Sequence, residues 1–357
     1  MSRPLRVALL SLEWPNAHHD SGGVAHYAYR LAAELATLVD LTVVTLSGAD
    51  PLPGARMVHV ARANSRLRRY YFAPLGARSL VSRLDVDVLH AFGDDWALRH
   101  GGVPIVRTFL GSSRHEARSS TGLRRYNHYV LSALEHLSAR RADVRLAIGA
   151  DSDQEFACHY LVPPVVGTPR LAAPPKAPNP RIVFVGTFAG RKRGWLAERL
   201  ADEASKALGQ PVEFVAVAPD SDRARWSSTT TVICGADDDE VMGHIAAAWL
   251  LLAPSTYEGF GIPAFEALSV GVRVVATGNP GSEYIAARVG HGGVLTTCDS
   301  DDELLPATVR AIEAGPQLTR TEEAAAAAAV EELLRRGSPG FLVGTVYPRA
   351  IRSARRR

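Results

Sequence analysis

Residues 249–268 read WLLLAPSTYEGFGIPAFEAL, and this stretch contains the most informative pattern in the sequence. Its first five residues are apolar and predict a buried strand. A loop with two glycines, Gly259 and Gly261, follows, and the next apolar residues predict a helix with Pro263 in its first turn. A strand, a glycine loop and a helix in this order form the repeating unit of a parallel α/β sheet. We therefore expect an α/β fold.

The same alternation of strand and helix patterns extends along most of the chain. Apolar runs typical of strands occur at residues 6–11, 41–46, 86–91, 105–109 and 144–148, and again at residues 181–185, 212–217, 230–234, 249–253 and 272–276. Between the two sets, residues 161–180 contain seven prolines, which are incompatible with a helix or a central strand. The sequence thus predicts two parallel-sheet domains joined by a proline-rich linker.

The length of 357 residues is sufficient for two domains that each have a core of their own. We expect a Rossmann-like N-terminal domain at residues 1–165, the linker at 166–180 and a Rossmann-like C-terminal domain at 181–338. A last helix at 339–357 could return to the N-terminal domain. Ligands bind at the carboxyl ends of the strands in such sheets, so we expect the functional site in a cleft between the domains.

The composition excludes several classes of protein. Forty Lys and Arg against 37 Asp and Glu leave a formal charge of +3, and the basic residues show little clustering apart from the end of the chain, so nucleic acid is not an expected partner. Three widely spaced cysteines indicate a reducing compartment, the cytoplasm. The longest apolar run, at 245–253, is too short to span a bilayer, and the first apolar run is too short for a signal peptide. A peripheral contact with a membrane stays open.

Two glutamates in the first stretch are candidate functional residues. Glu258 lies in the loop and Glu266 eight residues later in the helix, so both can point into one pocket. Gly259 and Gly261 leave backbone N–H groups accessible, and such groups bind hydroxyls or an anion near a helix N-terminus. Two other interpretations stay open at this point. The pattern also resembles a dinucleotide fingerprint with Glu283 further along, and the glutamates could simply lie at a solvated helix start.

Basic residues and glycines follow the first strand of each expected domain. Arg191 and Lys192 come shortly after Gly186, and adjacent cations at the carboxyl end of a strand suit a diphosphate. The alternative is a basic helix start that faces water. In the first domain, Gly22 and Gly23 open the first helix and could form an anion-binding turn or only a tight turn.

Together these segments resemble glycosyltransferase family 4, the retaining nucleotide-sugar glycosyltransferases of GT-B fold. The resemblance is most specific in PSTYEGFGIP at 254–263, where Glu258 and Glu266 have the spacing of the family. It continues in GGVAHY at 22–27, DVLHA at 87–91, VPIV at 103–106, GVRVVAT at 271–277 and GSE at 281–283.

The resemblance implies a role for each matching residue. Glu266 would accept both ribose hydroxyls of the donor nucleotide, and Glu258 would bind the transferred sugar. Arg191 and Lys192 would stabilise the diphosphate, and retention would proceed by front-face displacement, with the leaving phosphate taking the acceptor's proton. The residues expected to bind the donor are Gly22, Gly23, Gly186, Gly259, Phe260, Gly261, Glu266 and Glu283, and those expected to take part in the chemical step are Arg191, Lys192 and Glu258.

The sequence departs from the family pattern at three positions. Thr187 stands where the family often has an arginine, Phe92 replaces the second histidine of a common motif, and Leu110 stands where many relatives have a histidine. Leu110 would fit a donor sugar that lacks an outer hydroxyl, such as a 6-deoxysugar or a pentose. Alternatively Leu110 packs in the protein, or Arg114 or His115 takes over. His90, at the end of a strand, is a candidate contact to sugar or acceptor, or a packing residue.

We expect no metal site and no cofactor besides the nucleoside-diphosphate sugar itself. Asp85 and Asp87 precede a strand and are typical of a turn, and the other acidic runs precede helices and are typical of N-caps. The predicted activity is metal-independent, retaining transfer of a hexosyl or pentosyl group to a hydroxyl acceptor. The preference for arginine over lysine suggests a GC-rich bacterial genome, for which a small metabolite, an antibiotic or a cell-envelope glycan is a plausible acceptor. The alternatives are a sugar phosphorylase, a nucleotide-sugar epimerase and an inactive sugar-nucleotide-binding module.

Overall fold

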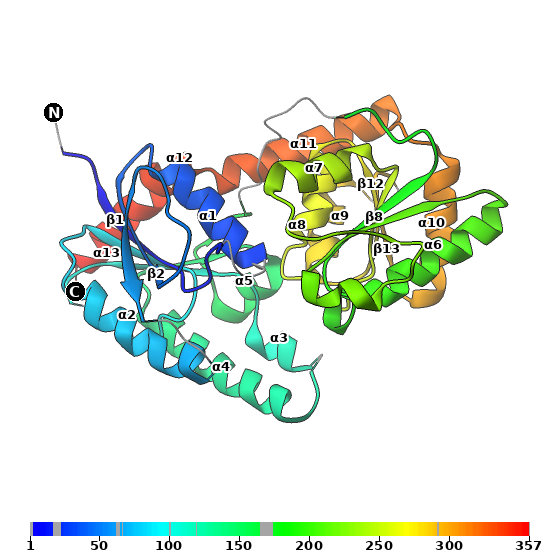
Figure 1. Ribbon diagram of the computed structural model, residues 1–357. Helices are drawn as coiled ribbons and strands as arrows, with labels where there is room; N and C mark the ends of the chain where they lie inside the picture. The colour runs from blue at the N-terminus through cyan, green and yellow to red at the C-terminus, as the bar shows by residue number, and fades with distance from the viewer. Residues whose placement is uncertain are drawn as a thin grey trace. The chain divides into compact units, whose positions relative to one another are not determined.

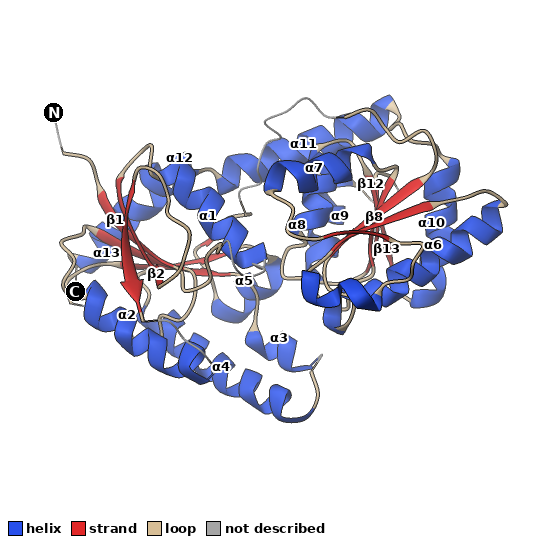
Figure 2. Ribbon diagram, viewed as in Figure 1, coloured by secondary structure: helices blue, strands red, loops and turns tan. Residues whose placement is uncertain are grey.

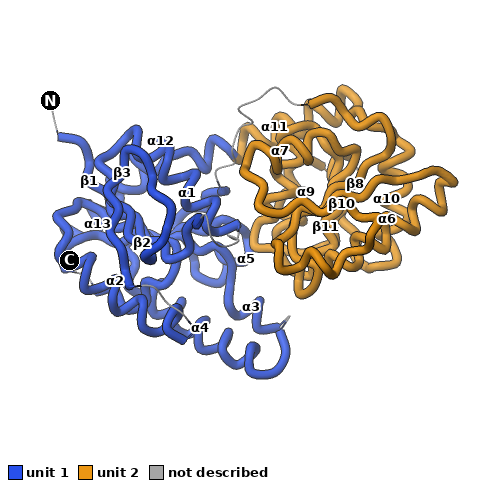
Figure 3. The backbone as a smooth tube through the Cα atoms, viewed as in Figure 1, with its two compact units in different colours: residues 1–165, 334–357 blue, residues 166–333 orange. Residues whose placement is uncertain are grey.

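The computed structural model of the protein describes residues 3–16, 23–61, 65, 67–99, 101–118, 120–164, 174–290 and 293–356. The chain forms two compact units: Met1–Val165 together with Leu334–Arg357 is unit 1, and Val166–Leu333 is unit 2 (Figure 3). Each unit contains one sheet with helices packed around it (Figures 1 and 2). Gly22, one of the expected site residues, and residues 166–173 of the expected linker lie outside the described residues.

Unit 1 is built on a sheet with the strand order β3-β2-β1-β4-β5-β6-β7 in which every neighbouring pair is parallel. Its strands are β1 (Arg6–Leu10), β2 (Asp40–Leu46), β3 (Ala55–Val60), β4 (Val88–Ala91), β5 (Ile105–Phe109), β6 (Val144–Ala147) and β7 (Tyr160–Leu161). Its helices before the linker are α1 (Gly23–Leu35), η1 (Arg68–Phe72), α2 (Ala73–Val81), α3 (Ser113–Arg118), α4 (Gly122–Arg141) and α5 (Ala150–Phe156).

Unit 2 repeats this plan with the order β10-β9-β8-β11-β12-β13, again all parallel. Its strands are β8 (Arg181–Val185), β9 (Glu213–Val217), β10 (Thr231–Ile233), β11 (Leu250–Ala253), β12 (Arg273–Thr277) and β13 (Leu295–Cys298). Its helices are η2 (Gly190–Lys192), α6 (Gly194–Leu208), η3 (Asp220–Arg225), α7 (Asp238–Ala247), α8 (Ile262–Ser269), α9 (Pro280–Val289), α10 (Asp301–Glu313) and α11 (Arg320–Gly337), the last of which runs into unit 1. This is the Rossmann strand order, and its direction reverses between β8 and β11.

Local sequence explains where these elements begin and what they bury. In α1, Tyr27, Leu31 and Leu35 recur on one helix face and are almost completely buried. At the start of α7, the carboxylate of Asp237 accepts a hydrogen bond of 2.9 Å from the backbone N–H of Glu240, which confirms an expected N-cap. Central strands such as β8 and β11 are continuous apolar runs because helices cover both faces of a parallel sheet.

The last part of the chain packs in unit 1. After α12 (Pro339–Phe341) and η4 (Leu342–Val346), helix α13 (Tyr347–Ala354) contacts β4 and β5. The side chain of Tyr347 is fully buried, and the guanidinium of Arg349 donates a hydrogen bond of 3.0 Å to the hydroxyl of Tyr160. The last helix therefore packs on the N-terminal sheet although the two are far apart in the sequence.

The predicted architecture of two Rossmann-like parallel-sheet domains is confirmed. Three strands were not predicted from the sequence, namely β3, β7 and β13. Strands β3 and β13 lie at sheet edges and contain polar residues, and β7 has only two residues. Edge strands bury fewer side chains, so their apolar pattern is weak.

Candidate functional site

The candidate site lies in unit 2 at the point where the strand order reverses. The segment that contains η2 follows β8, and residues 254–261 follow β11, its neighbour in the sheet. Loops at the carboxyl ends of two such strands diverge to opposite faces of the sheet and leave a crevice there. The two segments that sequence analysis selected for their cations and glutamates therefore meet at one place.

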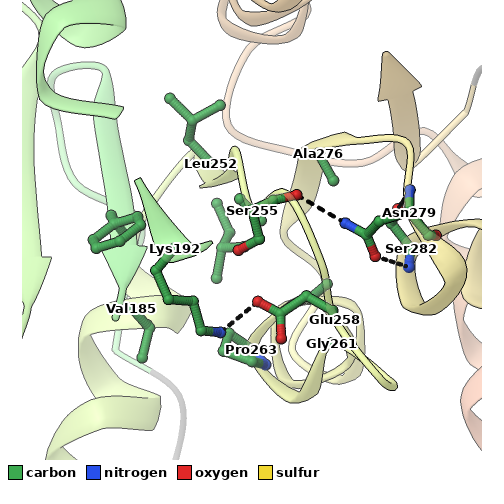
Figure 4. A pocket seen from close by; sticks show the side chains of 14 residues that line it. Val185, Lys192, Leu252, Ser255, Glu258, Gly261, Pro263, Ala276, Asn279 and Ser282 are labelled. Carbon is green, nitrogen blue, oxygen red and sulfur yellow. Dashed lines mark hydrogen bonds and ion pairs between the residues drawn. The ribbon is translucent and has the colours of Figure 1, made fainter. Parts of the chain in front are cut away.

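A cluster of three charged side chains forms where these loops meet. One carboxylate oxygen of Glu258 lies 2.6 Å from the Nζ of Lys192, and the other lies 2.8 Å from Nη1 of Arg191. Figure 4 shows the side chains of Lys192 and Glu258 pointing toward each other. The Glu258 side chain is only 12% exposed and that of Arg191 is 37% exposed. Two cations against one carboxylate leave this cluster of three side chains with a net positive charge.

Electrostatics keeps Glu258 ionised. Burial alone would raise the pKa of its carboxyl group, but the nearby charges of Lys192 and Arg191, with a hydrogen bond from Ser255, outweigh burial and lower this pKa to about 2. At neutral pH the group is an anion that can only accept hydrogen bonds. Glu258 is thus suited to bind hydroxyl groups and unsuited to donate a proton.

Backbone contacts hold the two loops in register. The backbone N–H of Thr256 donates to the carbonyl oxygen of Arg191 at 2.8 Å, and Nη1 of Arg191 donates to the carbonyl oxygen of Tyr257 at 2.9 Å. The side-chain amide of Asn279 donates to the carbonyl oxygen of Ser255 at 3.1 Å, as Figure 4 shows. The same Asn279 caps α9 in a capping box with Ser282.

Arg193, the third consecutive cation, has a structural role. Its guanidinium donates to the carbonyl oxygen of Pro254 at 2.6 Å and to Thr277 Oγ1 at 3.0 Å, and it forms an ion pair of 2.8 Å with Asp301. These contacts connect the loop after β11 with the end of β12 and the start of α10. Arg193 therefore fixes the frame in which Arg191 and Lys192 are presented.

Two glycines make the close packing at this site possible. A Cβ at Gly186 would lie 3.0 Å from Cγ of Lys192, so the glycine lets the lysine side chain cross the end of β8. A Cβ at Gly281, in the first turn of α9, would lie 2.7 Å from the carbonyl carbon of Phe260 and 2.9 Å from the carbonyl oxygen of Glu258. Only a residue without Cβ lets α9 come this close to the loop.

The N-terminus of α8 completes the site. Gly261 has φ of 87°, a left-handed conformation that favours glycine, and this N-cap residue has no side chain with which to cap the helix. The first turn of a helix has backbone N–H groups without an intrahelical partner, so it attracts anions and hydroxyls. Pro263 lies in this first turn, as predicted.

The other predicted donor-binding residues of unit 2 lie on α8, on α9 and in the loop before α8. Glu266 is on α8 and is 4% exposed, and Glu283 is in the first turn of α9. The Phe260 side chain is buried against Phe265 and Tyr284, so it contributes to the core. A cavity of about 20 Å³ lies among Lys192, Ser255, Glu258 and Asn279, with room for about one water molecule.

Unit 1 holds the remaining predicted residues, and His90 is a core residue there. Its Nδ1 lies 3.0 Å from the hydroxyl of Tyr347, its Nε2 lies 2.7 Å from Oγ1 of Thr108, and its ring packs on Phe92 with 4.7 Å between centroids. Burial, with the charge of Arg107, lowers the pKa of His90 to about 3. Both ring nitrogens have a polar partner inside the protein. His90 is therefore a packing residue, which was one of the two interpretations of the sequence.

Leu110, Arg114 and His115 lie in the segment that follows β5. Leu110 is partly buried directly after β5, and Arg114 is exposed on α3. His115 lies 3.6 Å from Asp151 and 3.8 Å from Glu155. Gly23 is the first residue of α1.

Sequence reasoning did not select Ser255, Asn279 or Arg193 as parts of the site. A signal was present for Asn279, because asparagine before proline at a strand end is typical of a helix N-cap. Nothing local distinguishes Arg193 from its two neighbours, since its partners are up to 108 residues away in the chain.

The fold resembles that of several solved glycosyltransferases. WaaG, a glycosyltransferase involved in lipopolysaccharide biosynthesis, aligns with a TM-score of 0.68 and 19% identity over 96% of this chain and 98% of its own. Sucrose-phosphate synthase from Thermosynechococcus elongatus aligns with a TM-score of 0.73 and 17% identity, and HepE from Anabaena, solved with UDP and glucose, with 0.64 and 16%; both cover 96% of this chain and 98% of their own. Two Rossmann-like units with this topology define the GT-B fold.

Two family models match the chain and identify its family. The model described as Glycosyltransferase Family 4 matches residues 21–169, and the model described as Glycosyl transferases group 1 matches residues 179–314. The chain belongs to glycosyltransferase family 4, as its motifs indicated. A comparison with curated proteins finds no match.

Within the parts of the chain that the structure describes, no group of three or more His, Cys, Asp and Glu side chains could hold a metal ion. None of the helices in those same parts has the length and apolar character needed to cross a membrane.

Proposed function

We propose that this glycosyltransferase moves a sugar from a nucleoside-diphosphate donor to a hydroxyl acceptor, with retention of anomeric configuration and without a metal ion. The observation that carries this proposal is the cluster of Arg191, Lys192 and Glu258 beside the uncapped start of α8. Cations and backbone N–H groups suit a diphosphate, and a permanently ionised carboxylate suits sugar hydroxyls. HepE, which was solved with UDP and glucose, supports a donor of this class.

In this proposal the diphosphate binds to Lys192, Arg191 and the N-terminus of α8. Both cations contact Glu258 directly, so these contacts hold the charges of the site in fixed positions. Negative charge grows on the diphosphate as the bond to the sugar breaks, and fixed cations stabilise that charge most in the transition state. They would take the role that a metal ion plays in other phosphate sites.

The transfer itself would be a front-face displacement. The bond between C1 of the sugar and the phosphate oxygen breaks, the acceptor oxygen bonds to C1 on the same face, and the acceptor proton passes to a phosphate oxygen. Glu258, held as an anion, would accept hydrogen bonds from the sugar and orient its C1. We assign the ribose hydroxyls to Glu266 on α8 and the acceptor to unit 1.

A nucleotide panel tests the donor class first. Thermal unfolding is measured with UDP, GDP, ADP and dTDP, and the matching base at about 100 times its Kd should add roughly 2.7 kcal/mol of stability. The Glu266→Gln variant should lose most of this stabilisation, because an amide accepts one ribose hydroxyl less well than a carboxylate accepts two. No stabilisation by any of the four nucleotides would refute the assignment.

The retention of configuration and the independence from metal ions are tested in the complete transfer reaction. The anomeric proton coupling of the product, read by NMR, should match that of the donor sugar. Incubation with EDTA should leave the rate within about twofold, and added Mg²⁺ or Mn²⁺ should not raise it. An inverted product, or a rate that depends on added metal, would overturn the corresponding part of the proposal.

A further inference from the structure

Two stretches of unit 1 are strongly basic. Residues 51–84 contain seven arginines and no Asp, Glu or Lys, and residues 117–134 contain three arginines and again no acidic residue. Removing these ten positive charges from the net charge of +3 leaves −7 on the rest of the chain. The expectation from the sequence that basic residues show little clustering is therefore wrong, because the small total hides two segments of opposite charge to the remainder.

The same stretches expose large apolar side chains. In η1 and the helices next to it, Leu67 and Phe72 are 61% and 59% exposed. On α4, Leu123 is 88% exposed and Tyr126 is 70% exposed. Val130 follows at the spacing that places it on the same helix face as these two residues. A leucine this exposed buries almost nothing in the fold, so it contributes little to stability.

The two stretches are neighbours in space. The hydroxyl of Tyr71 donates a hydrogen bond of 2.9 Å to the side-chain oxygen of Asn127, which connects η1 with α4. Figure 1 draws α2 and α4 at the same edge of unit 1. We call the exposed residues of 67–75 and 123–130 the arginine-rich patch.

Arginines of the patch are available to an external partner. Among the described residues, Arg68, Arg124 and Arg125 form no ion pair with a carboxylate, and all three are exposed. Arg69, by contrast, turns inward to Asp94 and Glu13. The guanidinium of Arg125 lies 6.0 Å from the ring centre of Tyr129, an arrangement that combines a cation with an apolar surface.

We propose that the arginine-rich patch binds the surface of an anionic lipid bilayer. Guanidinium groups pair with lipid phosphates, while leucine, phenylalanine and tyrosine side chains insert at the boundary between headgroups and acyl chains. The protruding aliphatic side chains favour lipid over nucleic acid, whose phosphate backbone offers them no apolar layer. The patch lies on helices, so its spacing is rigid. This inference does not depend on the sugar donor or the acceptor.

Vesicle sedimentation tests the proposal with the full chain. The protein should sediment with vesicles of equal parts phosphatidylglycerol and phosphatidylcholine, not with phosphatidylcholine alone, and high salt should release it. The double variant Arg124→Ala with Arg125→Ala should bind about tenfold to thirtyfold more weakly. The double variant Leu123→Ser with Tyr126→Ser should also lose binding. Circular dichroism should show that both variants fold, because all four side chains are exposed.

A matched control comes from unit 2. Trp195 is an exposed aromatic residue with Arg199 5.7 Å from its ring, the same kind of pair outside the patch. The variant Trp195→Ser with Arg199→Ala should bind the anionic vesicles as the unchanged protein does.

Insertion has a direct readout and clear opposite outcomes. In a Tyr126→Trp variant, fluorescence should be quenched by brominated acyl chains. The proposal would be refuted if the patch variants bound the anionic vesicles as tightly as the unchanged protein does. It would also be refuted if the unchanged protein did not bind these vesicles. A chain that is dimeric in solution and becomes monomeric in the patch variants, without binding vesicles, would also refute it and assign the patch to self-association.

Discussion

At the scale of single residues, the same side-chain type takes opposite roles according to its surroundings. Arg191 and Arg193 are two positions apart, yet Arg191 presents its charge at Glu258 and Arg193 braces Pro254 and Thr277. Lys192 and Glu258 are 66 positions apart and form the ion pair on which the candidate site is centred. The residue types indicated the chemistry of the site. The fold of the two loops brings Lys192 and Glu258 together as a pair.

Lys192 offers the sharpest test at this scale. The Lys192→Ala variant should lower turnover by a factor on the order of 10²–10³, because a fixed cation beside the departing diphosphate is lost. Lys206→Ala is the matched control, since Lys206 is an exposed lysine that forms an ion pair with Asp202 on its own helix. Steady-state rates at saturating donor measure the effect. Turnover within a few-fold of the unchanged protein would place the diphosphate elsewhere.

His90 predicts a pH dependence of stability. Its pKa is about 3 in the fold, against an ordinary value of 6.5 that applies to the unfolded chain. The unfolded chain therefore takes up the proton first, so the contribution of neutral His90 is complete above pH 6.5 and is lost as pH falls from 6.5 toward 3. The loss should be about 1.4 kcal/mol per pH unit in that window.

Comparison with a variant that cannot titrate isolates this contribution. In urea titrations, the stability difference between the unchanged protein and His90→Gln should be constant above pH 7 and should shrink below pH 6. Parallel stability curves from pH 8 to pH 5 would show that His90 takes up its proton in the fold as well.

At the scale of elements, the site depends on two helices that approach a loop from different sides. The loop after β11 opens α8, and α9 meets this loop through Gly281, whose N–H donates to the carbonyl oxygen of Glu258 at 3.0 Å. The connection of this loop to α8 was predictable from the sequence, because the strand, the loop and the helix are consecutive. The contact of the loop with α9 was not predictable, because it depends on how closely the helix packs against the loop.

Gly281→Ala tests this packing. The three atoms nearest to the added Cβ would be backbone atoms of Phe260 and Glu258, which cannot move without shifting the loop. We expect a loss of about 1–3 kcal/mol in stability and a raised KM for the donor. Gly243→Ala, in α7, is the control: its Cβ would meet nothing within 4 Å, so stability should stay equal or rise by up to about 1 kcal/mol. Equal behaviour of the two variants in thermal unfolding and kinetics would argue against a positioning role of Gly281.

At the scale of the whole molecule, the chain passes from unit 1 to unit 2 and returns. Leu342, Val346, Tyr347 and Ala350 of the returning segment are fully buried in unit 1. The hydroxyl of Tyr347 contacts His90, 257 positions earlier, so the last helix contributes to the core around β4. Unit 1 thus needs both ends of the described chain.

Removal of the Tyr347 hydroxyl tests whether the returning segment stabilises unit 1. Tyr347→Phe should lower stability by about 1–3 kcal/mol, because it leaves a buried nitrogen of His90 without its hydrogen bond. Tyr129→Phe is the matched control on exposed α4 and should change stability by less than about 0.5 kcal/mol. Urea unfolding followed by circular dichroism distinguishes the two. A neutral Tyr347→Phe would mean that the hydroxyl of Thr108 alone satisfies the histidine.

The sequence by itself determined the two parallel sheets, the motif of Glu258 and Glu266, and the cations after β8, because apolar periodicity and strand-end loops are local signals. It also contained the acid-free, arginine-rich segments, although a count of total charge concealed them. Only the tertiary structure decided that Lys192 and Arg191 clamp Glu258, that Phe260 and His90 are core residues, and that Gly281 admits α9. These outcomes depend on differences of a few tenths of an ångström in the packing distances between segments far apart in the chain, and no local pattern encodes such differences.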